Sequence, residues 1–244
     1  DVGWRVETDK GALQARNVIL AMGNSEERRI PAWAAALPNV HHIFDPVFVR
    51  AALPDWEHVI VAGGGISAAQ TANALLTDQP NGHITIWARH EQRISHFDSD
   101  PCWITALCLE QFYATDDPGK RREIICSARQ PGSMPPNVAE RLQTQIQAGR
   151  VRWMQGYGLP PPADHIILCT GFTGGRPGGD WLDAAIDTYN LPLADDGYPV
   201  VDAGLRWDDG LYVTGPLAEL EIGPVARNFI GARLASERIG RVIE

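Results

Sequence analysis

The sequence predicts an α/β protein in which helices cover a parallel sheet, and one segment carries most of this prediction. Residues 58–62 (HVIVA) form a short apolar run that ends in three glycines, 63–65, and residues 67–76 (SAAQTANALL) are rich in helix formers. After the turn sequence 78–82 (DQPNG), residues 83–87 (HITIW) return to strand character. This order of strand, glycine turn, helix and strand is typical of a right-handed βαβ unit.

The glycines of this turn have the spacing of a dinucleotide-binding site. Gly63 permits a tight turn, Gly65 lets the backbone approach a pyrophosphate, and the small Ala68 lets the helix pack closely on the strand. Gly64 and Ser67 complete the turn, and the helix N-terminus would face the phosphates. A glycine-rich turn without a ligand is the alternative. The strand before the turn and the helix and strand after it favour the dinucleotide site.

The residues that follow the second strand favour NADP over NAD. An NAD-selective site would place a carboxylate here for the ribose 2′-hydroxyl, whereas this chain has Ala88, Arg89 and His90. A guanidinium has a permanent charge and a planar set of donors that pairs with phosphate oxygens, so Arg89 suits a 2′-phosphate. The alternative is a solvated arginine on the surface.

Weaker patterns predict further elements on both sides of this unit. Residues 4–8 and 13–17 are expected to form a hairpin, and the proline-rich stretch 32–56 reads as a linker with a short strand at 41–44. We also expect helices at 104–112, at 138–148 with Asn137 as its cap, and from Pro224 onward, and strands at 123–127, 151–154, 165–170, 198–202 and 211–214.

Composition and charge argue against several classes of protein. The net charge of −9 repels polyanions and the 21 basic residues are scattered, so nucleic acid is not expected as a partner. The longest apolar runs, 18–22 and 166–169, are far shorter than the roughly 20 residues that span a bilayer, and no signal-peptide pattern is recognisable. We therefore expect a cytoplasmic protein without a membrane partner.

Side chains typical of metal or nucleophilic catalysis show no pattern in this sequence. Its four cysteines (102, 108, 126 and 169) lack both a C-x-x-C pair and histidines at zinc spacing, so we expect no metal and predict buried free thiols. No Ser-His-Asp or Cys-His grouping follows from spacing, and the catalytic residues stay unassigned.

Residues 164–172 (DHIILCTGF), with Pro177 five residues later, have the spacing of a known motif. At this point the chain resembles the flavin-dependent N-hydroxylating monooxygenases and related flavin-containing monooxygenases, whose pattern is D-x-x-x-(L/F)-A-T-G-Y-x-x-x-x-(H/P). Gly171 is kept, whereas Cys169 replaces the alanine and Phe172 the tyrosine.

Three further segments extend this resemblance. Residues 20–23 (LAMG), which end in Gly23, resemble the first of two strands that connect the FAD and NADP domains in that superfamily. Residues 210–216, which include Gly215, resemble the last strand of the FAD domain. Gly223 and Pro224 resemble the start of its flavin-facing helix, where exposed backbone donors would stabilise the negative charge of a reduced flavin. His42, within HHIFDP, loosely resembles a related fingerprint, although histidines at a strand start are more often structural.

The resemblance implies a Rossmann-like, three-layer flavoprotein with two dinucleotide-binding domains that is incomplete at its N-terminus. We expect residual strands of the FAD domain at 1–31, a linker at 32–56, the NADP-binding domain at 57–180, and a return to the FAD domain at 181–244. The FAD glycine motif is not among these residues. That segment would be supplied in cis or by another chain.

The resemblance also implies an NADPH-dependent, FAD-containing oxidoreductase of the monooxygenase kind. In such an enzyme NADPH passes hydride to the flavin, O2 is activated, and a small-molecule nucleophile is oxygenated. Two alternatives stay open, namely a flavin-dependent reductase that does not oxygenate and a non-catalytic NADP-binding fragment.

Overall fold

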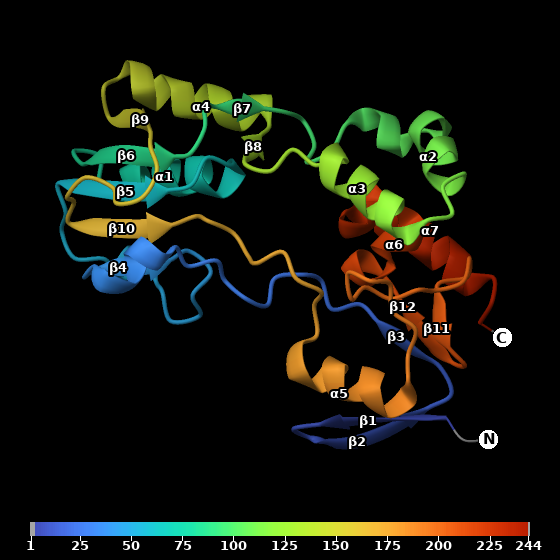
Figure 1. Cartoon of the computed structure of the whole chain (residues 1–244). Helices are drawn as coiled ribbons and strands as arrows, with labels where there is room; N and C mark the ends of the chain where they lie inside the picture. Colours follow the sequence, from blue (N-terminus) through green and yellow to red (C-terminus); the bar gives the residue numbers. More distant parts are fainter. Residues whose placement is uncertain (1–2, 244) are drawn as a thin grey trace. The chain divides into compact units, whose positions relative to one another are not determined.

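The computed structural model (Figure 1) describes residues 3–243, except for the side chain of Ala106. The chain forms two compact units, and each unit is built from separated stretches of sequence. Unit 1 contains Asp1–Glu26, Ser99–Arg129 and Gly174–Glu244, and unit 2 contains Glu27–Asp98 and Gln130–Thr173.

Unit 2 is organised around a five-stranded sheet whose neighbouring strands are all parallel. Their order across the sheet is β4 (Val40–His42), β10 (His165–Leu168), β5 (His58–Ala62), β6 (His83–Ala88) and β9 (Val151–Gln155). Because the strands are parallel, the carboxyl ends of all five lie at one edge of the sheet. The predicted strand-turn-helix-strand unit at its centre is confirmed.

The two faces of this sheet are covered by different segments. Val59 and Val61 share a core cluster with residues of α1 (Ile66–Asp78) and α4 (Pro136–Gln147). Ile60 and Ala62 point to the opposite face and pack near Ala34 of the short helix η1 (Ala32–Ala36). A short parallel pair, β7 (Arg93–Ile94) and β8 (Ser133–Met134), and the turn η2 (Arg50–Ala52) complete unit 2.

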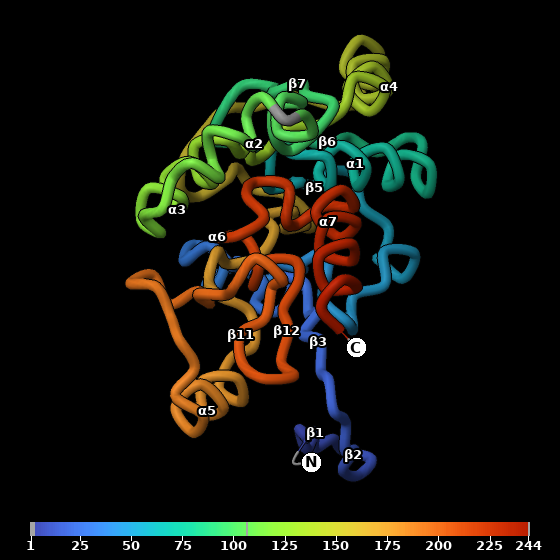
Figure 2. Tube along the Cα trace, turned by 90° about the vertical axis from the view of Figure 1, so that its right-hand side faces the viewer, coloured from blue at the N-terminus to red at the C-terminus, as the bar shows by residue number. Residues whose placement is uncertain are grey.

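Unit 1 combines two small sheets with several short helices. The hairpin of β1 (Trp4–Thr8) and β2 (Gly11–Ala15) was predicted and is confirmed. In the second sheet, β12 (Leu211–Val213) lies between the parallel strand β3 (Val18–Leu20) and the antiparallel strand β11 (Arg206–Asp208). The helical elements are η3 (Pro101–Ile104), α2 (Ala106–Tyr113), α3 (Pro118–Ala128), α5 (Gly179–Tyr189), η4 (Gly215–Ala218), α6 (Glu219–Ile222), η5 (Pro224–Arg227) and α7 (Phe229–Gly240). Figure 2 shows α7 beside β12 and β3, with which it shares a core.

Several local predictions are wrong, and each has a physical reason. The strand expected at 123–127 is part of helix α3, because Asp117 caps its start and accepts a hydrogen bond of 2.8 Å from the Lys120 backbone N–H. Helix α4 begins at Pro136, before the predicted cap. Residues 198–202 form no regular strand; they make an isolated bridge between Leu193 and Pro199, beside which the Val200 N–H donates to the Pro192 carbonyl. Pro224 begins a short 3-10 turn, and α7 starts after Asn228, whose side chain accepts from two backbone N–H groups.

The predicted domain boundaries differ from the two compact units. The stretch 32–56, expected as a linker, belongs to unit 2 because it contributes the outer strand β4. The stretch 99–129, expected within the NADP domain, belongs to unit 1, and arginines of α3 form ion pairs with carboxylates of α6. The predicted domains were continuous stretches of sequence, whereas each compact unit combines stretches that are separated in the sequence.

The cysteine prediction is wrong for three of the four residues. Cys102 and Cys108 form a disulfide, and Cys126 is exposed rather than buried. Only Cys169 is a buried free thiol, and burial raises its pKa to about 11. None of the helices in the described part of the chain has the length and apolar character to span a bilayer.

Candidate functional site

The turn between β5 and α1 requires glycine at its first position. Gly63 has a φ of +148°, and a Cβ atom there would lie 2.4 Å from the carbonyl oxygen of Cys169. The Gly63 N–H donates to the carbonyl of Trp87 at 3.0 Å. The turn is therefore held between β10 and β6, with no space for a side chain.

The next two glycines, Gly64 and Gly65, also have close neighbours where a side chain would lie. A Cβ on Gly64 would lie 2.7 Å from the His90 ring, and one on Gly65 would lie 3.2 Å from the Cα of Gly132. Ala68 is fully buried, as expected for a helix that sits close on the sheet. Ser67 lies beside it in the first turn of α1, where the first backbone N–H groups have no acceptor within the helix. These groups are suited to bind an anion such as a pyrophosphate.

Arg89 lies at the same edge of the sheet as the glycine turn. It directly follows β6, which is the parallel neighbour of β5. Its side chain is exposed, and no described residue pairs with its guanidinium. The structure therefore brings the predicted pyrophosphate and 2′-phosphate residues to one edge, with an exposed arginine side chain at the second position.

Gly171 lies just beyond β10, at this edge of unit 2. It has a φ of +73°, and its carbonyl accepts a hydrogen bond of 2.9 Å from the Arg29 N–H. The His42 Nε2 atom lies 3.1 Å from the same carbonyl, while His42 Nδ1 lies 3.2 Å from the Phe44 backbone nitrogen. Because Phe44 donates to Nδ1, the ring proton is on Nε2, which donates to Gly171.

His42 thus joins two connecting segments that are distant in sequence. Burial lowers the pKa of His42, which is only 3% exposed, and the neutral ring fits this pattern of one donor and one acceptor. The Thr173 N–H donates to the carbonyl of Glu27 and extends the same contact. In the sequence, His42 was singled out only by the loose resemblance of HHIFDP to a related fingerprint.

The predicted flavin residues lie in unit 1. Gly23 follows β3 and Gly215 follows β12, and these strands are parallel neighbours. Both glycines have positive φ, of +70° and +62°, and no atom lies within 4 Å of a Cβ built on either. Gly223 and Pro224 are buried, and the Gly223 N–H donates to the Glu219 carbonyl at 2.9 Å; their role at the flavin stays a prediction.

A buried ion cluster in unit 1 was missed by the sequence analysis. The Glu219 side chain is fully buried and accepts hydrogen bonds from Arg227 at 2.7 and 2.9 Å and from Arg129 at 2.7 Å. Arg122 forms a further ion pair with it. Burial alone would raise the pKa of Glu219, but hydrogen bonds and charge from the arginines outweigh burial and lower it. The partners are far apart in sequence, so no local pattern indicated the cluster.

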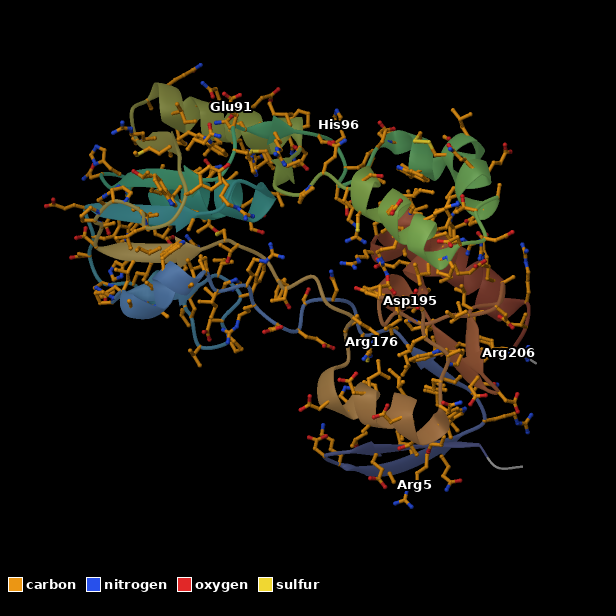
Figure 3. The ribbon with its side chains drawn as sticks, viewed as in Figure 1. Arg5, Glu91, His96, Arg176, Asp195 and Arg206 are labelled. Carbon is orange, nitrogen blue, oxygen red and sulfur yellow. A yellow bond between two sulfur atoms is a disulfide. The ribbon has the colours of Figure 1, made fainter. Side chains whose placement is uncertain are left out.

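Other basic side chains of unit 1 are spread over separate elements. Figure 3 shows Arg5 on the hairpin, Arg176 before α5 and Arg206 on β11. Each forms an ion pair with a nearby carboxylate: Arg5 with Glu7, Arg176 with Asp183, and Arg206 with Asp202. These arginines therefore do not combine into one basic surface.

Comparison with known families identifies the chain. Residues 2–131, more than half of its length, match the family L-lysine 6-monooxygenase/L-ornithine 5-monooxygenase. The chain belongs to this family. The resemblance to N-hydroxylating flavin monooxygenases is thereby confirmed. A search of curated protein sequences found no significant match to the chain.

Solved structures of this family share the fold. The L-lysine 6-monooxygenase from Pseudomonas syringae is 17% identical with a TM-score of 0.65, over 98% of this chain and 67% of its own. The ornithine N-hydroxylase from Kutzneria sp. 744 is 17% identical with a TM-score of 0.66, over 97% and 67%. The cadaverine monooxygenase from Erwinia amylovora is 13% identical with a TM-score of 0.69, over 94% and 62%. The chain thus has the Rossmann-like flavoprotein monooxygenase fold and spans about two thirds of the length of these proteins.

Proposed function

We propose that these residues form the NADPH-binding unit and part of the FAD-binding unit of a monooxygenase that hydroxylates a primary amine of a small molecule. The observation that carries the proposal is that the glycine turn at Gly63 and the exposed Arg89 lie at the same edge of the sheet, in a chain of the lysine and ornithine monooxygenase family. The amine substrate follows from the family, whose named members act on lysine and ornithine.

Each cofactor would be held by a different set of residues. The backbone of Gly63, Gly64 and Gly65 with the start of α1 would bind the NADPH pyrophosphate, and Arg89 would bind its 2′-phosphate. The open backbone at Gly23 and Gly215 fits a FAD molecule bound across the ends of β3 and β12. When bound, the two cofactors supply the hydride and the activation of O2. The chain's own residues bind and orient them, which is consistent with the lack of an assigned catalytic side chain.

Isotope incorporation tests the reaction in the full-length protein. With NADPH, FAD and ¹⁸O2, we expect lysine, ornithine or cadaverine to give a hydroxylamine that carries one ¹⁸O atom. Mass spectrometry of the product, together with NADPH consumption, measures this result. If NADPH is consumed with every amine and only reduced oxygen species form, the protein is a flavin-dependent reductase and the proposal is wrong.

Replacing Arg89 with alanine tests the choice of NADPH. The change removes the charge that pairs with the 2′-phosphate, so NADPH should bind roughly tenfold to hundredfold more weakly while NADH binding changes little. Calorimetric titration of both nucleotides measures the difference. Arg152→Ala is a matched control, because Arg152 is an exposed arginine inside the neighbouring strand β9. Equal losses for NADPH and NADH would show that the ribose lies elsewhere.

The cytoplasmic location stays a prediction from the sequence. The disulfide between Cys102 and Cys108 argues against this location, because disulfides rarely persist in the reducing cytosol.

A further inference from the structure

The segment that follows β9 lies beside Arg89, at the edge of the sheet that also carries the glycine turn. In the register of the sheet, Gln155 of β9 is the partner of Ala88, the residue before Arg89. The Gly156 N–H donates to the Ala88 carbonyl at 2.9 Å, and the Gln155 side chain donates to the Arg89 carbonyl at 3.3 Å. The start of this segment is therefore fixed next to the residue that we propose to bind the 2′-phosphate.

The next residues of this segment wrap around the Trp87 indole. A Cβ on Gly156 would lie 2.0 Å from the Trp87 ring, so the backbone at this position lies directly against that ring. Two residues later, the Gly158 carbonyl accepts a hydrogen bond of 3.2 Å from Trp87 Nε1. Tyr157 lies between these two glycines and is thereby held on the side of the sheet to which Trp87 points.

Arg89 points to the same side of the sheet as Trp87. Successive side chains of a strand alternate between its two faces. This alternation continues past the end of β6, because a Cβ on Gly64 would lie 3.3 Å from the Ala88 Cβ and 2.7 Å from the His90 ring. Ala88 and His90 therefore share one side of the sheet, and Trp87 and Arg89 share the other.

The Tyr157 side chain is available to a ligand. It is 76% exposed, and no hydrogen bond or ring contact involves it among residues 3–243. The two neighbouring aromatic rings are not available in this way, because His90 packs against the glycine turn and Trp87 is covered by Gly156. Tyr157 thus presents an exposed aromatic ring on a backbone that is already fixed, on the side to which Arg89 points.

The order of groups on the ribose predicts where the adenine base of NADPH lies. The pyrophosphate is attached to C5′, the 2′-phosphate to C2′ and the base to the adjacent C1′. With the pyrophosphate at the turn after β5 and the 2′-phosphate at Arg89 after β6, the base continues in the same direction, toward β9. The stacked rings of Phe44 and Phe172 follow β4 and β10, on the other side of β5, and so lie away from the base.

We propose that the Tyr157 ring stacks on the adenine base of bound NADPH. The inference rests on the proposed function, since the ligand is the NADPH of that proposal. Stacking uses the flat face of the base, so it requires the aromatic ring of Tyr157 and not its hydroxyl group. Arg89 then distinguishes NADPH from NADH, whereas Tyr157 binds the adenine that both nucleotides contain.

Titration with 2′,5′-ADP tests this inference, because this compound contains the adenosine of NADPH and its 2′-phosphate. In calorimetry on the full chain, Tyr157→Ala should weaken binding at least about fivefold, the lower end of the effect of base–aromatic stacking. Tyr157→Phe keeps the ring and should bind within about twofold of the natural protein. The urea midpoint should not change in either variant, because the side chain is exposed.

Tyr189→Ala is the matched control, because Tyr189 is also an exposed tyrosine but lies on α5 of unit 1. This variant should bind 2′,5′-ADP as the natural protein does. Unchanged affinity in Tyr157→Ala, or an equal loss in Tyr157→Ala and Tyr157→Phe, would overturn the inference.

Arg89→Ala in the same titration separates this inference from the proposed function. If Arg89→Ala weakens 2′,5′-ADP at least roughly tenfold and Tyr157→Ala does not weaken it, the NADPH site stands and the adenine lies elsewhere. If 2′,5′-ADP does not bind to the natural protein, or if Arg89→Ala leaves its affinity unchanged, the proposed NADPH site is itself wrong.

Discussion

Replacing Glu219 with glutamine should lower the free energy of unfolding by about 3–5 kcal/mol, because the change leaves buried arginine charge without its counter-ion. Glu219 is fully buried, and Arg122, Arg129 and Arg227 all pair with it. The amide oxygen can still accept from one pair of arginine donors, but the NH2 group that replaces the other oxygen cannot accept, so the loss includes charge and hydrogen bonds. Urea unfolding followed by tryptophan fluorescence measures it.

Glu123→Gln provides the matched control for this prediction. Glu123 is an exposed glutamate on α3, the helix that also carries Arg122. Its replacement should change stability by no more than about 0.5 kcal/mol, as is usual for surface positions. Equal shifts of the urea midpoint in the two variants would contradict the role of the buried cluster.

The same cluster predicts how stability depends on pH. The arginines hold the pKa of Glu219 in the folded protein below its ordinary value of 4.5. A carboxylate with a lowered folded pKa stabilises the protein above its unfolded pKa, and this contribution is lost as the pH falls through the folded value. The difference in stability between the natural protein and Glu219→Gln should therefore be constant near neutral pH and shrink below pH 4.5.

Gly63→Ala should weaken NADPH binding at least roughly hundredfold, because a strained or displaced turn no longer presents its backbone to the pyrophosphate. The methyl group would lie 2.4 Å from the Cys169 carbonyl oxygen, and alanine rarely adopts a φ of +148°. Calorimetric titration with NADPH, alongside the urea midpoint, separates lost binding from lost stability.

Gly175→Ala is the control for the glycine turn. No atom lies within 4 Å of a Cβ at Gly175, and its backbone is not in the left-handed region. This variant should bind NADPH as the natural protein does. If Gly63→Ala retains full affinity and stability, the turn either tolerates a side chain or does not bind the nucleotide.

Local patterns predicted the centre of unit 2, because the strand, the turn and the helix there are each determined by residues that are adjacent in sequence. The apolar run 58–62, the glycines after it and the helix formers of α1 are adjacent in sequence, and the structure confirms all three. The superfamily was also predictable, since residues 164–172 keep the spacing of its motif. The roles of the individual cofactor residues stay predictions.

Features that depend on distant contacts were not predictable from local patterns. The partners of Glu219 come from α3 and from η5, about a hundred residues apart in sequence, and neither segment has a charge pattern that indicates the other. The stretch 123–127 contains the apolar pair Ile124 and Ile125, which reads as a strand when the cap at Asp117 is overlooked. The outer strand β4 was assigned to a linker because its three residues are surrounded by prolines.

The interleaving of the two units has a consequence for synthesis on the ribosome. Unit 2 is complete once Thr173 has emerged, so its sheet can form while later residues are still being added. Strand β3 is made near the start of this sequence, but its partner β12 comes almost at the end. Strand β3 therefore cannot pair with β12 until residue 213 has been made, and this contact of unit 1 forms only late in synthesis.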